Sequence, residues 1–262
     1  MQITALILLF IIIGWIFWYT KKKPQGTISF PESFRTILLK HVHFYNLLTD
    51  ADKSAFEKRM LQFLDHVKIT GIGVMVKEED KVFIAASALI PIFFFDNWEY
   101  NNLNEVLLYP DSFSEEFELQ KDKERPVLGM VGNGPMQHVM ILSQAALREG
   151  FLKESGTQNT AIHEFVHLID KTDGDINGIP ENILSRQYII PWINRMHEEI
   201  REIREGNSDI NPYGATNQGE FFAVVSEYFF EKPAELNSKH PELYKILQKI
   251  FNNDNGKPFV ER

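Results

Sequence analysis

Apolar side chains between residues 50 and 67 recur at the spacing of an α-helix, with Thr49 or Asp50 in the N-cap position. The residues that share its apolar stripe are Phe56, Met60, Phe63, Leu64 and Val67. Residues 81–95, KVFIAASALIPIFFF, are apolar almost all round, which predicts a buried element. The small residues within this run favour a helix over a strand.

Two short apolar runs follow, EVLLY at 105–109 and MQHVMILS at 136–143, and both are bounded by turn signals that are typical of strands. The later patterns are helical, and they cover residues 157–171, 191–204, 217–230 and 241–251. Short strands first and mostly helices afterwards predict an α+β fold with a small mixed sheet. Because no second change of composition follows, we expect one domain over residues 30–262.

The N-terminal run ITALILLFIIIGWIFWY, residues 3–19, carries no charge and is soon followed by three lysines at 21–23. Its length is at the short end for a transmembrane helix, and its aromatic residues suit a membrane interface. A cleaved signal peptide is the alternative, but it would carry its basic residues before the run. We therefore expect a single-pass anchor over residues 1–20 and a polar linker over 21–29. The lysines place the domain on the cytosolic side of the cytoplasmic (inner) membrane.

The composition restricts the chemistry that the chain can carry. The 262 residues have a formal net charge of −9, so we expect no direct binding to nucleic acid. The sequence contains no cysteine, which excludes disulfides, thiol catalysis and cysteine-ligated zinc. Any metal must therefore be held by histidines and carboxylates.

The motif HEFVH places two histidines four residues apart in a predicted helix. His163 and His167 then share one helix face at about 6 Å, a separation that lets two imidazoles reach one zinc ion. Glu164 is rotated about a quarter turn away, where it would lie beside a metal-bound water. A surface helix with two solvated histidines is the alternative, but the residues around the motif are too apolar for that.

A catalytic zinc needs a third protein ligand, and spacing alone leaves several candidates. They are His197, His240 and downstream carboxylates. Glu220 and Glu227 lie seven residues apart on one face of an apolar helix, where buried carboxylates need a cation or donor. Glu220 also lies in the first turn of that helix, so the alternative is that its negative charge only stabilises the N-terminal end of the helix.

The segments AIHEFVHLID, DGDINGIP and YGATNQGEFFAVVSEYFF, in this order, resemble the Mlc titration factor A family of zinc-dependent peptidases. The resemblance runs from about residue 30 to about residue 252, and the metal site is also similar to that of anthrax lethal factor. It implies a zincin-like peptidase domain, with aminopeptidase activity as one form. The family usually has Lys-Leu-Asp after the second histidine, where this chain has Leu168, Ile169 and Asp170. The best-known soluble members lack the N-terminal anchor.

The resemblance also implies a role for each matching residue. His163, His167 and Glu220 would hold one zinc ion, and Glu164 would be the general base. Tyr213, seven residues before Glu220, would stabilise the tetrahedral intermediate by donating from its hydroxyl group; the alternative is a tyrosine that packs at a turn.

Two carboxylates are candidates for orienting the histidine ligands, because such histidines usually donate their other ring N–H to an acceptor. They are Asp170, three residues after His167, and Glu227. The predicted strand that contains His138 is a candidate edge for pairing with an extended substrate. The other histidines lack partners at ligand spacing and are interpreted as structural or solvated: His41, His43, His66, His197 and His240.

Two further alternatives concern function. The loop DGDINGIP alternates calcium-type ligands, but position 12 counted from Asp173 is Leu184 instead of glutamate, so we predict a structured turn. The resemblance also implies a different class of protein: one that sequesters a transcriptional repressor, with hydrolysis secondary. A pseudo-enzyme is disfavoured because the base and all three proposed ligands are present.

Overall fold

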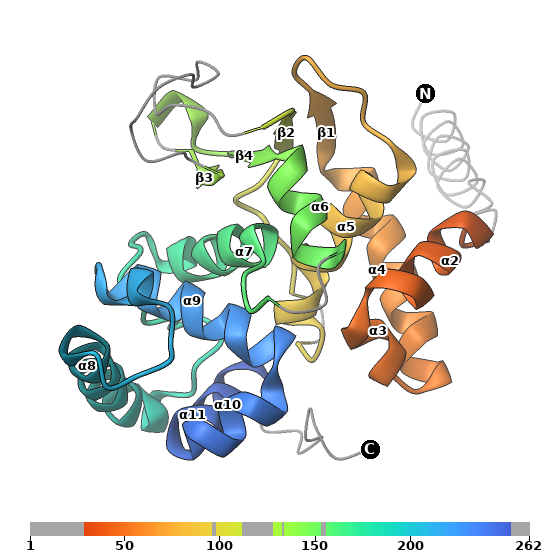
Figure 1. Ribbon diagram of the computed structural model, residues 1–262. Coiled ribbons are helices and arrows are strands. Elements are labelled where there is room, and N and C mark those ends of the chain that lie inside the picture. Colours follow the sequence, from red (N-terminus) through yellow and green to blue (C-terminus); the bar gives the residue numbers. More distant parts are fainter. Residues whose placement is uncertain (1–28, 96–97, 112–127, 133, 153–155, 253–262) are drawn as a thin grey trace, which may run out of the picture. The chain divides into compact units, whose positions relative to one another are not determined.

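Asp52 N–H donates to the Thr49 side chain (3.2 Å), and this cap begins the first long helix, α4 (Asp50–His66). The computed structural model describes residues 29–95, 98–111, 128–132, 134–152 and 156–252 (Figure 1). The chain divides into two compact units, Met1–Pro31 and Glu32–Arg262. All of the elements below belong to the second unit.

The described residues contain ten α-helices. Besides α4 they are α2 (Glu32–His41), α3 (His43–Leu47), α5 (Glu78–Leu89), α6 (Gln144–Leu152), α7 (Thr160–Asp170), α8 (Ile189–Glu205), α9 (Gln218–Glu231), α10 (Pro233–Lys239) and α11 (Pro241–Phe251). Short 3-10 turns connect several of them, including η1 (Ile90–Ile92), η3 (Lys171–Asp173) and η5 (Pro212–Ala215).

A four-stranded sheet completes the fold, in the order β1 (Lys68–Gly71), β2 (Glu105–Tyr109), β4 (Val139–Ser143) and β3 (Gly129–Val131). The first three strands are parallel, with Val106 opposite Met140, and β3 runs antiparallel to β4. The predicted α+β class and small mixed sheet are therefore confirmed.

The two strongest helical patterns of the first half form as predicted. On α4 the apolar stripe is buried except for Leu64, which is half-buried. Helix α5 is buried from Val82 to Leu89 and continues into η1, so the long apolar run is a buried helix. The α-helix changes to a 3-10 turn at Pro91, because proline has no backbone N–H to donate to the helix.

Helix α7 lies between the sheet and α9, and it packs against both (Figure 1). It begins at Thr160, three residues after the predicted start, because Asn159 caps it. Helix α9 begins after a second cap, Asn217, and its residues from Phe221 to Phe230 are all buried. The two motif-bearing helices are thus fixed by local caps and by mutual burial.

The sequence patterns above do not predict six of the elements: α2, α3, α6, α10, β1 and β3. The predicted anchor, and nearly all of the predicted linker, lie outside the described residues. No helix in the described part of the chain is long and apolar enough to cross a bilayer.

Candidate metal centre

His163 and His167 lie one turn apart on α7, and their imidazole rings converge. The ring centroids are 4.7 Å apart at an interplanar angle of 85°, and the two Nε2 atoms are 3.1 Å apart. Both residues are buried, as are their neighbours from Ala161 to Asp170, so the alternative of a solvated surface helix is wrong. The two ring nitrogens face one point in space, which is what a shared cation requires.

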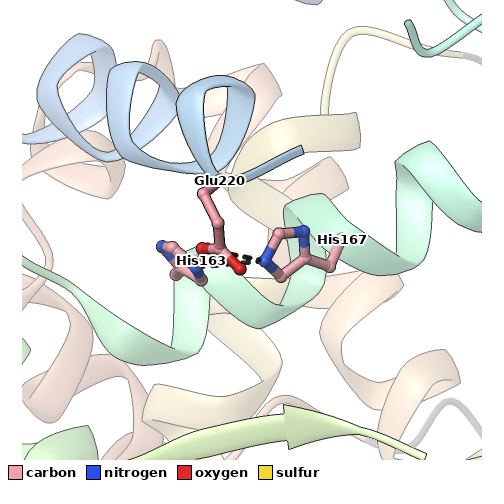
Figure 2. Close-up of side chains that lie close together, drawn as sticks. All are labelled: His163, His167 and Glu220. Carbon is pink, nitrogen blue, oxygen red and sulfur yellow. Dashed lines mark hydrogen bonds and ion pairs between the residues drawn. The ribbon is translucent and has the colours of Figure 1, made fainter. Parts of the chain in front are cut away.

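Glu220 comes from the first turn of α9 and reaches the same point. Asn217 caps this helix by accepting from the Glu220 N–H (2.9 Å). The Oε2 atom of Glu220 then lies 3.0 Å from Nε2 of His163 and 3.6 Å from Nε2 of His167. Figure 2 shows the carboxylate entering between the two rings from the facing helix. The three ligand atoms lie within 4.8 Å of one another, and no other such group occurs in the described residues.

This separation fits a zinc ion. Ligands that bind zinc at 2.0–2.1 Å with tetrahedral angles are separated by about 3.3 Å. The three observed separations, 3.0, 3.1 and 3.6 Å, bracket that value. Two imidazoles and one carboxylate are also the donor set of many catalytic zinc sites, which leave a fourth position open.

Glu227, two turns along α9 from Glu220, contacts the other nitrogen of the first histidine. Its Oε1 atom lies 2.7 Å from Nδ1 of His163. When Nδ1–H donates to this carboxylate, the lone pair of Nε2 points at Glu220 and His167. Glu227 is therefore placed to orient the ring of His163.

The electrostatics of the cluster correspond to a site built for positive charge. Burial by itself lowers the pKa of His163, but hydrogen bonds to Glu220 and Glu227 outweigh it and raise that pKa to about 10. Burial works against the ionised form of Glu220 too, yet its bonds to both histidines hold the pKa of its carboxyl well below the ordinary range. The surrounding carboxylates therefore favour positive charge at this point.

Glu164 lies beside the cluster without joining it. Its side chain is buried, and burial raises the pKa of its carboxyl above the ordinary value. It lines a cavity of about 490 Å³ together with His163, His167 and Glu220. Strand β3 crosses directly over it: a Cβ atom on Gly129 would lie only 2.5 Å from Cγ of Glu164. The sequence contains no local signal for this contact, because β3 is too short to show a pattern.

Tyr213 lines the same cavity from the turn η5. Its ring centroid lies 6.0 Å from that of His163, at an angle of 33°. Asn211 begins this turn by accepting from the Tyr213 N–H (3.0 Å). The side chain is half-buried at the cavity wall, so it is near the cluster without being part of it.

Asp170 has a contact in the turn that follows α7. Its Oδ2 atom accepts from the Gly178 N–H (2.7 Å), and Gly178 has a left-handed φ of 75°. A Cβ there would lie 2.4 Å from the carbonyl oxygen of Gln218, so this turn packs against the start of α9. Nδ1 of His167 is buried and has no hydrogen-bond partner in the described part of the chain. That Asp170 orients a histidine stays a prediction.

Among the described strands, the one at the edge of the sheet beside the cavity is β3 and not β4, so the prediction that the strand containing His138 forms the substrate edge is wrong. Strand β4 pairs with β2 on one side and β3 on the other, and both of its edges are therefore used. The cavity is lined instead by residues 129–131 of β3. The sequence predicts a strand at β4 but cannot tell which neighbours it will have.

Four of the remaining six histidines have other contacts. His240 lies between two carboxylates, with Nδ1 3.1 Å from Glu199 and Nε2 2.7 Å from Asp209. His197 contacts Gln218, His66 contacts a carbonyl of its own helix, and the ring of His41 packs edge-on against Phe83. None of them belongs to the histidine–carboxylate cluster found among the described residues.

The chain is similar in sequence to several known proteins. The uncharacterized protein slr2042 of Synechocystis sp. is 29% identical over 247 residues, which cover 90% of this chain and 89% of that protein. Mlc titration factor A of Pectobacterium atrosepticum is 31% identical over 170 residues, or 59% of this chain and 61% of the relative. Mlc titration factor A of Escherichia coli (strain 55989 / EAEC) is 28% identical over the same length.

The sequence profile of a peptidase family, described as glucose-regulated metallo-peptidase M90, matches residues 16–252. The match spans all of the elements that build the histidine–carboxylate cluster, and it implies a metal ion in a protein of metallopeptidase type. Together with the relatives, it confirms the resemblance to the Mlc titration factor A family. The chain belongs to the glucose-regulated metallo-peptidase family M90.

Proposed function

We propose that this chain is a zinc-dependent peptidase and that His163, His167 and Glu220 hold the metal. The observation that carries the proposal is the convergence of these three side chains within 4.8 Å, from two helices far apart in sequence. Zinc bound by such a set lowers the pKa of a coordinated water to about 7 and polarises the carbonyl of a substrate.

Three protein groups would act around that site. Glu164 takes the proton of the attacking water and later delivers it to the leaving amine, a task for which burial has raised the pKa of its carboxyl. Tyr213 donates its hydroxyl to the oxyanion that forms on the substrate. Glu227 holds the His163 ring in the tautomer that exposes the lone pair of Nε2.

Strand β3, which is at the edge of the sheet in the described part of the chain, offers a backbone surface for an extended peptide. Leu128 O accepts from Ser143 N (2.8 Å) and Gly132 N donates to Val139 O (2.9 Å), so positions 128 and 132 bond toward β4. The alternation of an antiparallel pair turns the backbone groups of Gly129 and Val131 the other way. A substrate that binds there would continue the sheet beside Glu164.

The direct test is zinc content combined with turnover in the purified full-length chain. We expect about one zinc ion per chain and hydrolysis of a peptide or a chromogenic amino-acid amide, which also separates endopeptidase from aminopeptidase activity. His163→Ala should lose the zinc, whereas Glu164→Gln should keep it and lose turnover. Full activity in Glu164→Gln would rule out the proposed base.

A second candidate function comes from the names of the relatives, which refer to titration of Mlc. Under this alternative the chain binds an Mlc-type transcriptional repressor, and hydrolysis is secondary. A pull-down of such a repressor by wild type and Glu164→Gln separates the two. A binding protein retains both its partner and its effect on repression in the variant, whereas a peptidase retains at most the partner.

We also propose that residues 3–19 anchor the protein in the cytoplasmic membrane, on the basis of their uncharged sequence and the lysines after them. The catalytic domain would then face the cytosol. Membrane fractionation after an alkaline carbonate wash tests the anchor, and protease treatment of spheroplasts tests the orientation. Recovery of the whole protein in the wash would contradict the anchor.

A further inference from the structure

Asn159 is the residue that immediately precedes α7, and it is completely buried. It lies four residues before His163, at the point where the start of α7 meets the second half of α9. An asparagine before a helix is ordinarily a cap, a task that also suits serine, threonine or aspartate. The contacts of Asn159 go beyond that task.

All four polar groups of Asn159 are used, two toward each helix. Toward α7, its carbonyl oxygen accepts from the His163 N–H (2.9 Å) and its Oδ1 accepts from the Ile162 N–H (3.2 Å). Toward α9, its backbone N–H donates to Oε2 of Glu227 (2.6 Å) and its Nδ2 donates to Oε1 of Glu231 (2.9 Å). Of these four bonds, only the one from Nδ2 to Glu231 requires a side-chain amide.

These bonds connect the backbone of a proposed zinc ligand to the carboxylate that orients its ring. Asn159 accepts from the main chain of His163 and donates to Glu227, whose other oxygen contacts Nδ1 of the same histidine. We infer that Asn159 is a positioning residue of the metal centre, which sets the ring of His163 through Glu227. This inference rests on the proposed function, because it assumes that His163 binds metal.

The side-chain amide is what keeps the backbone of Asn159 against α9. Glu227 and Glu231 are one turn apart on that helix, so the two donors of Asn159 bind two successive carboxylates on one face. From the other side, α6 closes the space: a Cβ on Gly150 would lie 3.0 Å from Cγ of Asn159. Without the hydrogen bond from Nδ2 to Glu231, only the bond from the backbone N–H to Glu227 would hold Asn159 against α9.

The charge at this position is as important as the shape. Burial raises the pKa of Glu231 to about 7, the Asn159 hydrogen bond opposes this, and the nearby charge of Glu227 adds to it. Asn159 is therefore a neutral donor between two carboxylates. An aspartate of the same shape keeps the cap but places a third carboxyl group there, and it cannot donate to Glu231 unless it takes up a proton.

The test uses the exchange of donor and acceptor in the full-length chain. Asn159→Asp removes the donor, and Glu231→Gln added to it supplies a donor from the opposite side. Asn102→Asp is the matched control, because Asn102 Nδ2 donates to Leu168 O of α7 (2.9 Å) without touching Glu227. At pH 8, where Glu231 is mostly ionised, zinc affinity is measured by chelator competition. The visible spectrum of the Co²⁺ form and the melting temperature of the metal-free form are measured alongside.

We expect Asn159→Asp to weaken zinc binding by about 10-fold or more, which is the usual effect of substituting a residue that supports a metal ligand through hydrogen bonds. Its Co²⁺ spectrum should shift. The double variant Asn159→Asp/Glu231→Gln should recover most of the zinc affinity and most of the wild-type spectrum. Asn102→Asp should lower the melting temperature alone. If Asn159→Asp lowers only the melting temperature, Asn159 is merely a cap and the inference is overturned.

Two further outcomes are distinguishable. If Asn159→Asp does not fold, Glu231→Ala decides, because it removes the acceptor and leaves the cap; unchanged zinc affinity there overturns the inference and weaker affinity supports it. A wild-type chain that binds no zinc overturns the proposed metal site, and this inference with it.

Discussion

Gly129 and Glu164 are in contact across the gap between strand β3 and helix α7. A Cβ atom built on Gly129 would lie 2.5 Å from Cγ and 2.7 Å from Oε1 of Glu164, distances that side chains do not tolerate. The absence of a side chain at Gly129 therefore determines where the proposed base can lie.

Gly129→Ala should displace the Glu164 carboxylate and leave the proposed zinc ligands in place. We expect turnover to fall on the order of 100-fold, since a misplacement of about 1 Å has effects of that size. Zinc content and fold should be unchanged, as measured by metal analysis and circular dichroism. Gly156→Ala is the control, because among the described residues its new methyl group would meet only the backbone N of Gln158, at 3.7 Å. Equal activity in both variants would contradict the proposed position of the base.

Glu220→Ala should abolish stable zinc binding. The carboxylate is the one proposed ligand that α9 supplies, and two imidazoles alone would leave the site two positions short of tetrahedral coordination. The measurement is zinc per chain after dialysis against a weak chelator, with Glu78→Ala on the exposed start of α5 as the control. Retention of one zinc ion per chain in Glu220→Ala would show that the third ligand lies elsewhere.

Tyr213→Phe tests the proposed oxyanion donor without changing the shape of the cavity wall. Removal of one such donor lowers kcat by about 100- to 1,000-fold, with little effect on ground-state binding. We therefore expect a lower kcat, a nearly unchanged KM and a full complement of zinc. A variant that turns over as fast as wild type would leave Tyr213 as a residue that only packs against His163.

Glu231→Gln should stabilise the metal-free protein in a pH-dependent way. The folded-state pKa of Glu231 is about 7, above its ordinary value of 4.5, so the native state binds this proton more tightly than the unfolded state does. Its contribution to stability is therefore complete below pH 4.5 and is lost as the pH rises from 4.5 to 7. A glutamine in its place does not ionise, and it can still accept from Nδ2 of Asn159.

The free energy of unfolding, measured in urea from pH 4.5 to 8, checks this prediction. The advantage of Glu231→Gln over wild type should grow across that window to about 3 kcal/mol and then remain constant. Glu198→Gln, at an exposed position of α8, serves as the control and should show no such trend. An advantage that is independent of pH would mean that folding does not raise the pKa of Glu231.

Much of the site is already determined by local sequence, because a helix repeats every few residues. The spacing of His163 and His167 places both on one helix face. The same periodicity predicts α4, the buried α5 and the α+β class. These features depend on neighbours in the chain, so the sequence alone shows them.

Only the tertiary structure decides which distant groups meet. It brings Glu220 to His163, 57 residues earlier in the chain. It puts β3 instead of β4 at the edge of the sheet among the described strands, and it packs Gly129 against the side chain of Glu164. It also gives Asp170 a contact with the Gly178 amide and places Asn159 between two carboxylates. The physical reason is that strand pairing and helix packing are set by long-range burial. A glycine, a cap or a carboxylate therefore acquires its contacts only when the whole chain has folded.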